Sequence, residues 1–161
     1  IKGNISEIAY LAEGIGTTKG VDANLDALST EGNLRWHTDL ARKVSTQTGA
    51  AIVISGPIDI VADSHEAWAI RNGHPMMANI TGTGCMSAGV IGCCVGADPQ
   101  ALLPSCVCAM SAMGICGELA YEKLLSVDGG SGTYRVLLMD AMSKLDGATL
   151  TRRSKAERLR I

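Results

Sequence analysis

Two hydrophobic periodicities run through the middle of the chain's first half, and each predicts a different kind of element. Over 34–48 the apolar residues fall near one face of a helix, and Gly49 is well placed as its C-terminal cap. Residues 50–56 form a short apolar, β-branched run closed by serine and glycine, which is typical of a strand buried on both faces. Residues 58–62 and 67–71 alternate in the manner of strands, and the polar residues between them predict a hairpin.

The second half is apolar over longer stretches, which predicts helices. Residues 86–97 are apolar nearly all round, so we expect a helix enclosed by other elements. Another helix is expected over 104–125, because proline is tolerated in a first helical turn. These two helices should form much of the core. Residues 136–145 predict a further amphipathic helix, and 148–161 form a charged tail that we expect to end as an edge strand.

Three segments remain between these elements. Residues 7–14 predict a short helix that Asn4 or Ser6 can cap. Residues 15–30, rich in glycine, threonine and aspartate, are expected to form a loop, and 128–135 a turn-rich connection. The order of helix, strand, hairpin and paired helices indicates a layered α/β fold with helices on a sheet. A length of 161 residues suits one domain spanning the whole chain.

Composition excludes several classes of partner. The net charge is −2 and the one basic cluster lies in the last ten residues, so nucleic acid is not an expected partner. The apolar stretches are interrupted before the roughly 18 residues of a membrane span, so we expect a soluble, cytoplasmic protein. The chain begins with neither methionine nor the layout of a signal peptide, which indicates processing or a fragment.

Six cysteines occur without a CxxC pair. Their spacing fits neither a secreted disulfide framework nor a zinc site, so we expect buried free thiols in a reducing compartment. They are Cys85, Cys93, Cys94, Cys106, Cys108 and Cys116.

The sequence "TGTGC", residues 81–85, is the first candidate for chemistry. If a strand ends near Ile80 and a helix begins near Cys85, the first helical amides have no internal partner and the helix dipole adds positive charge there. Such a turn binds anions, and glycines let the backbone approach a phosphate closely. The alternative is a tight turn whose glycines only relieve crowding.

The thiol of Cys85 bears on the choice between an anion-binding turn and a purely structural one. A thiol at a helix N-terminus ionises more easily and can act as a base or a nucleophile. A nucleophile usually needs a nearby histidine, and His74 lies eleven residues upstream. His74 can equally be a turn histidine bonded to backbone, and Cys85 can equally be a buried inert thiol.

Two further features can each be interpreted either structurally or functionally. Asn4 and Glu7 lie three residues apart and can hold a hydrated Mg²⁺, or they can cap a helix. Ser55 ends a predicted strand, where open α/β sheets bind ligands, but it can also be an ordinary serine between strand and turn.

Five stretches point together to a known family: "KGNISEI", "KGVDA", "VISGPIDIVAD", "NGHP" and "TGTGC". In their order and spacing they resemble the C-terminal portion of hydroxyethylthiazole kinases, enzymes of thiamine biosynthesis and salvage in the ribokinase-like superfamily. The resemblance is specific at Cys85, because superfamily relatives usually carry aspartate there. It implies a ribokinase-like fold with helices packed on a mainly parallel sheet, of which this chain lacks the N-terminal part.

The resemblance also implies a reaction: transfer of the γ-phosphoryl group of ATP, with Mg²⁺, to the primary alcohol of 4-methyl-5-(2-hydroxyethyl)thiazole. Gly82, Thr83, Gly84 and the Cys85 amide would form an anion hole, with Gly82 also touching the thiazole. The Cys85 thiol would act beside the substrate hydroxyl as a weak base or positioner.

In the same picture Glu7 and Asn4 organise the magnesium, and Lys2 and Ser55 contact ATP. The chain departs from the family at Lys2, which stands where arginine is usual, at Ser55 for threonine, and at Pro57 for glutamate. Lysine replaces a planar phosphate clamp by a flexible point charge. The family resemblance further implies a homotrimer with active sites between protomers.

Three other functions remain open at the level of sequence. One is a nucleotide-dependent hydrate dehydratase on the same superfamily fold, against which Cys85 counts. Another is a truncated, non-catalytic homologue that acts as a binding or assembly subunit. The last is a thiol redox protein.

Overall fold

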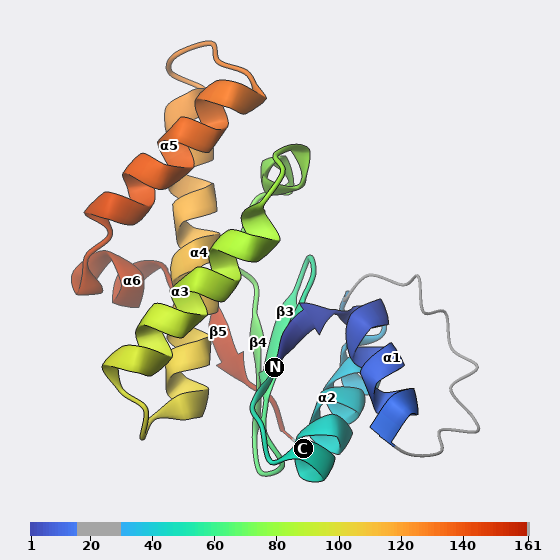
Figure 1. The fold of residues 1–161 in the computed structure, drawn as a ribbon. Helices are drawn as coiled ribbons and strands as arrows, with labels where there is room; N and C mark the ends of the chain where they lie inside the picture. Colours follow the sequence, from blue (N-terminus) through green and yellow to red (C-terminus); the bar gives the residue numbers. More distant parts are fainter. Residues whose placement is uncertain (16–29, 161) are drawn as a thin grey trace. The chain divides into compact units, whose positions relative to one another are not determined.

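The computed structural model describes residues 1–15 and 30–160, and the chain divides into two compact units (Figure 1). Unit 1 comprises residues 1–70 with 157–161, and unit 2 comprises 71–156. Most of the loop expected over 15–30, and the "KGVDA" stretch with it, lies outside the described residues.

Five strands form one sheet in the order β1-β2-β3-β4-β5. β1 and β2 are parallel, whereas β2–β3 and β3–β4 are antiparallel. The α/β class is therefore confirmed, but the described sheet is mixed and not mainly parallel, because the predicted hairpin supplies antiparallel neighbours. The edge strand expected in the charged tail is also present, as β5. The strands are β1 (Lys2–Asn4), β2 (Ile52–Ser55), β3 (Asp59–Ala62), β4 (Ala67–Ile70) and β5 (Ala156–Arg158).

Two helices pack with the sheet in unit 1: α1 (Ile5–Ile15) and α2 (Leu34–Thr48). The predicted bounds of α2 are confirmed, and so is its cap, because Gly49 has φ 71° and its N–H donates to the Ser45 carbonyl. Buried aliphatic side chains from both helices meet alternate residues of the strands, among them Ile52 and Ile54. This apolar layer fixes the register of β2, since a slip by one residue would turn its side chains to the other face.

Unit 2 is helical. α4 contacts both α3 and α5, and it supplies most of the buried residues of the unit. Its proline lies in the first turn, as expected. The elements are η1 (Pro75–Asn79), α3 (Thr83–Ala97), α4 (Leu102–Leu124), α5 (Ser131–Lys144) and α6 (Gly147–Arg153).

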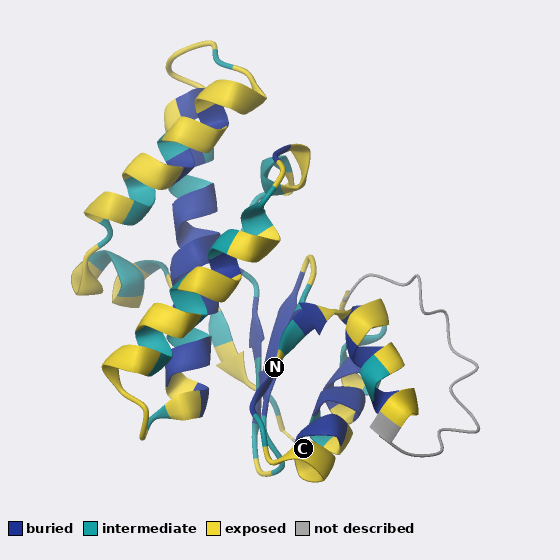
Figure 2. Cartoon of the chain, in the orientation of Figure 1, coloured by how far each residue is buried: buried dark blue, intermediate teal, exposed yellow. Residues whose placement is uncertain are grey.

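The expectation of an enclosed helix over 86–97 is wrong. α3 has one buried residue, Ser87, and its other side chains are exposed or half-buried along the whole helix (Figure 2). An all-round apolar composition allows a helix to be buried, but burial also requires other elements to pack around it. Among the described residues, α4 is the element that packs extensively on α3, and it covers one side of that helix.

Two local predictions also need correction. A 3₁₀ helix, η1, precedes the glycine turn where a strand was expected near Ile80. The segment 128–135 is helical from Ser131 onward, because Tyr134 is fully buried in the core of unit 2 and its hydroxyl donates to the Gly117 carbonyl at 2.9 Å. Tertiary packing here outweighs the turn-forming composition of "DGGSG".

α4 is long and apolar enough to cross a membrane by length and composition, which the sequence reasoning missed. Two thirds of its most apolar window is buried inside the protein. A core helix passes the same test, and the packing of α4 against α3 and α5 is that of a core helix.

Candidate functional site

The ends of two parallel strands in unit 1 bring Asn4 and Ser55 together. β1 and β2 pair in register with Asn4 opposite Ser55, and the Ser55 hydroxyl donates to the Gly3 carbonyl at 3.4 Å. The carboxyl ends of parallel strands are where α/β sheets bind ligands. The predicted position of Ser55 at such an edge is therefore confirmed.

Asn4 and Glu7 cap the start of α1 reciprocally. The Glu7 N–H donates to Asn4 Oδ1 at 2.9 Å, and the Asn4 N–H donates to Glu7 Oε2 at 2.7 Å. This capping box satisfies two amides at the helix start. The structure therefore confirms the capping interpretation of this pair. Asn4 and Glu7 are both exposed.

Capping leaves room for a magnesium ion at the same pair. A carboxylate has about four acceptor positions and an amide oxygen two, so each group keeps a free lone pair after one backbone bond. Mg²⁺ keeps several waters and takes few protein ligands. The described residues contain no group of three or more His, Cys, Asp or Glu side chains that could hold a metal by themselves. Asn4 and Glu7 thus fit as ligands of a hydrated ion and not as a full cage.

Lys2 lies on the same face of the sheet as Asn4 and Ser55. It is opposite Val53 in the β1–β2 ladder, two residues before the Asn4–Ser55 pair, and residues two apart on a strand share a face. Lys2, Asn4, Glu7 and Ser55 are therefore one group of predicted site residues within unit 1.

Asp59 is a buried acid beside this group that the sequence reasoning missed. Its carboxylate accepts the Gly56 N–H at 2.9 Å. Burial raises the pKa of Asp59 to about 7, whereas the Gly56 hydrogen bond and the positive charge of Lys2 act in the opposite direction. The available signal was an aspartate at the start of a buried strand, directly after the turn "SGPI", in place of the apolar residue that such a position usually carries.

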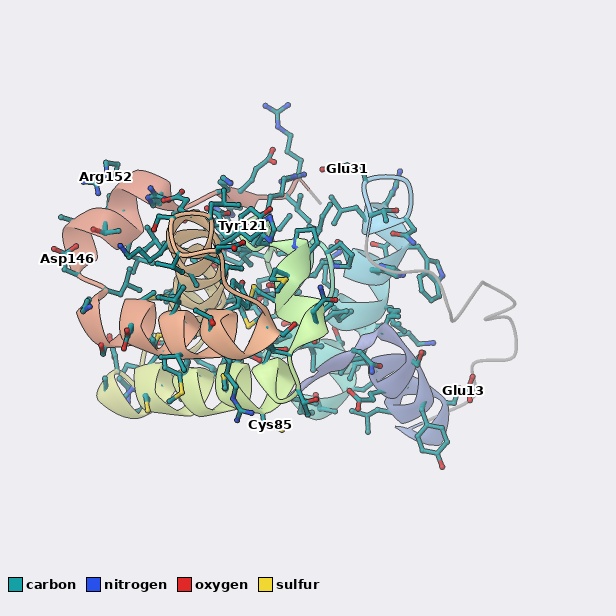
Figure 3. All side chains as sticks on the ribbon, turned by 90° about the horizontal axis from the view of Figure 1, so that it is seen from above. Glu13, Glu31, Cys85, Tyr121, Asp146 and Arg152 are labelled. Carbon is teal, nitrogen blue, oxygen red and sulfur yellow. The ribbon has the colours of Figure 1, made fainter. Side chains whose placement is uncertain are left out.

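The glycine turn of unit 2 begins α3. Gly82 is the N-cap with φ 98°, a left-handed conformation that favours glycine, and the first α-helical bond runs from the Met86 N–H to the Gly82 carbonyl at 2.9 Å. The helix starts two residues earlier than expected, at Thr83, so Cys85 lies in the first turn. Its side chain is exposed near the start of α3 (Figure 3).

His74 has the structural role that the sequence left open. Its Nδ1 accepts the Met76 N–H at 3.1 Å and caps η1, and its ring stacks on Tyr121 with 3.6 Å between the centroids. The described hydrogen bonds give His74 no link to Cys85, so a paired cysteine–histidine nucleophile has no support from these contacts.

The cysteines are free thiols, as expected, but they are not uniformly buried. Cys106 and Cys116 are buried, Cys94 and Cys108 are half-buried, and Cys85 and Cys93 are exposed. Of the two alternatives that the sequence left open for Cys85, the buried thiol is therefore wrong.

The predicted site residues form two groups, one in each unit. Unit 1 holds Lys2, Asn4, Glu7 and Ser55 at a sheet edge, and unit 2 holds Gly82, Thr83, Gly84 and Cys85 at the start of a helix. A mixed α/β sheet, a polar strand edge and a glycine turn that opens a helix are features of α/β proteins that bind phosphorylated ligands.

Comparisons narrow this class to one family. The model of the hydroxyethylthiazole kinase family matches residues 1–148, and the chain belongs to that family. It is 49% identical to a hydroxyethylthiazole kinase of Desulfovibrio desulfuricans, covering all of this chain and 59% of the relative. It is 44% identical to one of Clostridium acetobutylicum, covering 93% of this chain and 55% of that relative.

A solved structure gives the same fold. The hydroxyethylthiazole kinase protein of Pyrococcus horikoshii OT3 matches with a TM-score of 0.78 at 22% identity, over 99% of this chain and 54% of that chain. The chain thus spans between half and three fifths of the length of these relatives.

Proposed function

We propose that the protein carrying this chain transfers the γ-phosphoryl group of ATP to the primary alcohol of 4-methyl-5-(2-hydroxyethyl)thiazole. The observation that carries the proposal is the exposed Cys85 in the first turn of α3, directly after a left-handed glycine, in a member of the thiazole kinase family. We further propose the setting that goes with this activity: a cytoplasmic homotrimer that salvages or synthesises the thiazole half of thiamine.

The first proposed contact is the turn formed by Gly82, Thr83, Gly84 and Cys85. Its backbone amides would stabilise the negative charge that develops on the transferred phosphoryl group. Amides of a first helical turn point along the helix axis, where the dipole adds partial positive charge. Donors fixed before the reaction stabilise a transition state without reorganisation. Gly82 is also the proposed contact to the thiazole, because it carries no Cβ and lets the ring approach the backbone.

The thiol of Cys85 is assigned to the acceptor alcohol. Phosphoryl transfer through a loose transition state needs orientation of the attacking hydroxyl more than early removal of its proton. The thiolate form of Cys85 can accept a hydrogen bond from the hydroxyl, hold it in place and take its proton late, which regenerates the neutral thiol.

The strand edge of unit 1 is assigned to the nucleotide. Lys2 places a positive charge for phosphate oxygens, and Ser55 offers a hydroxyl at the end of β2. Asn4 and Glu7 would hold hydrated Mg²⁺, which neutralises charge on the phosphates. Because lysine binds phosphate as a point charge, we expect ATP affinity to depend on how firmly Lys2 is positioned.

The test compares two exposed cysteines on one helix. Cys85→Ala should lower kcat about 100-fold, which is the lower end of the usual contribution of a positioned acid–base group and suits a weak base. Cys93→Ala, a matched change farther along α3, should leave kcat unchanged. Kinetics are measured as thiazole-dependent ADP formation. Equal rates for both variants would remove Cys85 from the proposed reaction.

A further inference from the structure

Asp59 lies at the sheet edge that carries the proposed nucleotide contacts. In the antiparallel β2–β3 ladder Ile54 pairs with Ile60, so the next residues along are Ser55 and Asp59. Since Asn4 pairs with Ser55 on the other side, polar residues follow one another across three neighbouring strands.

The same registers place these residues on one face. Paired residues of adjacent strands point to the same side of a sheet, and the side alternates along each strand. Lys2, Asn4, Ser55 and Asp59 therefore share the face opposite to that of Ile54, which packs with α1 and α2.

The contacts of Asp59 explain how a carboxyl is tolerated while it is 9% exposed. Burying a charge is costly unless it is hydrogen-bonded and paired. Asp59 accepts the Gly56 N–H at 2.9 Å, and the charge of Lys2 opposes the effect of burial on its pKa. The hydrogen bond alone needs only a neutral acceptor, which asparagine would supply as well, so the turn by itself does not require the negative charge of Asp59.

We propose that Asp59 is a positioning residue that holds the Lys2 ammonium in place for the phosphates of a nucleoside triphosphate. The proposal rests on the assignment of Lys2 and Ser55 to ATP under the proposed function. Asp59 also fixes Gly56, the residue after Ser55, so one carboxylate restrains both contacts.

The physical reason lies in the lysine side chain. Lysine has a flexible four-carbon stem, and ordering it on ligand binding costs conformational entropy. A carboxylate that orders the ammonium beforehand removes part of this cost from ATP binding. Asp59 acts through Lys2 and not on the reacting atoms, so its removal changes ATP binding and leaves the chemical step alone.

The experiment uses Asp59→Asn, which keeps an acceptor for the Gly56 N–H and removes the charge. The matched control is Asp63→Asn. Asp63 lies just after the other end of β3 and likewise accepts backbone N–H groups, from His65 and Glu66. KM for ATP, kcat, ATP affinity by calorimetry and thermal unfolding are measured for each variant of the protein that carries this chain.

Asp59→Asn is expected to raise KM and Kd for ATP about three- to tenfold, the range for losing the pre-ordering of one flexible side chain. Neither kcat nor the thermal unfolding temperature should fall. Asp63→Asn should leave KM for ATP unchanged. In a Lys2→Met background, Asp59→Asn should add no further increase, because the two changes act through one group.

Three results would overturn the proposal. An unchanged KM for ATP in Asp59→Asn while the wild type phosphorylates the alcohol defeats it and leaves the proposed function intact. An equal loss of ATP affinity in the Lys2→Met background shows that Asp59 does not act through Lys2. A wild-type protein that neither binds nor uses ATP overturns both the proposed function and this role of Asp59.

Discussion

Two neighbouring helices of unit 2, α3 and α4, are both rich in small apolar residues, yet their burial differs sharply. α4 has fourteen buried residues and α3 has one. α4 is contacted by α3 on one side and by α5 on another, with η1 and α6 also against it. The comparison teaches that composition sets how much of a helix can be buried, whereas the number of neighbouring elements sets how much is.

The figures show the same difference along the helix length. α4 is buried through its centre, while α3, apart from Ser87, is exposed or half-buried from its first turn to its last (Figure 2). An exposed first turn also leaves Cys85 accessible, which the proposed reaction requires (Figure 3). The buried helix provides stability to the unit, and the exposed helix presents the candidate chemistry.

The largest expected effect is on the free energy of unfolding, when one methyl group is added to the buried helix α4 and, for comparison, to α3. In Gly114→Ala of α4 the new Cβ would lie 2.7 Å from the Asn72 backbone, so that backbone must move. Unfolding by urea should show a loss of about 3 kcal/mol, the upper range for overpacking a core.

The matched change on α3 is Gly92→Ala, whose Cβ meets nothing within 4 Å. It should be neutral or stabilising by up to about 1 kcal/mol, because alanine favours helix more than glycine does. Equal losses in the two variants would show that α3 is as tightly packed as α4.

A smaller effect is expected in thiol reactivity. Burial raises the pKa of Cys116 in α4 to about 11, and Cys93 in α3 is exposed. At pH 8 in the folded protein, Cys93 should react with a thiol reagent about a hundredfold faster than Cys116, because the thiolate is the reactive form and needs access. Peptide mass spectrometry after timed alkylation measures both rates.

The pH dependence of Cys116 follows from the direction of its shift. A raised folded-state pKa means that the neutral thiol contributes stability below the pKa of the unfolded chain, and this contribution is lost as pH rises through about 11. Between pH 7 and pH 9 the rate at Cys116 should therefore stay low, and urea should abolish its protection. Rapid labelling of Cys116 without denaturant would contradict the burial of α4.

Local signals in the sequence predicted local structure well. The bounds of α2, its Gly49 cap, the buried strand β2 and the β3–β4 hairpin are confirmed, because each depends on a short periodicity or a single capping residue. The position of Ser55 at the end of a strand was also predicted, whereas β1 and the pairing of Asn4 with Ser55 were not, because Asn4 was interpreted only as a residue at the start of a helix.

Features that depend on distant contacts were not predictable. The exposure of α3 depends on which elements lie against it, and the helical start of α5 depends on the burial of Tyr134. Asp59 was missed because its proposed role depends on Lys2 of β1, which is far from it in sequence and is brought near it in the sheet by β2. Periodicity reports which face a residue occupies but not which side chains from other segments share it.

The most direct measurement follows labelled phosphate from the γ-position of ATP in the presence of 4-methyl-5-(2-hydroxyethyl)thiazole and Mg²⁺. With the protein that carries this chain, the account predicts that the label appears on the alcohol oxygen of the thiazole, with one ADP formed for each phosphorylated alcohol. Label found only in free phosphate, at a rate independent of the thiazole, would contradict it.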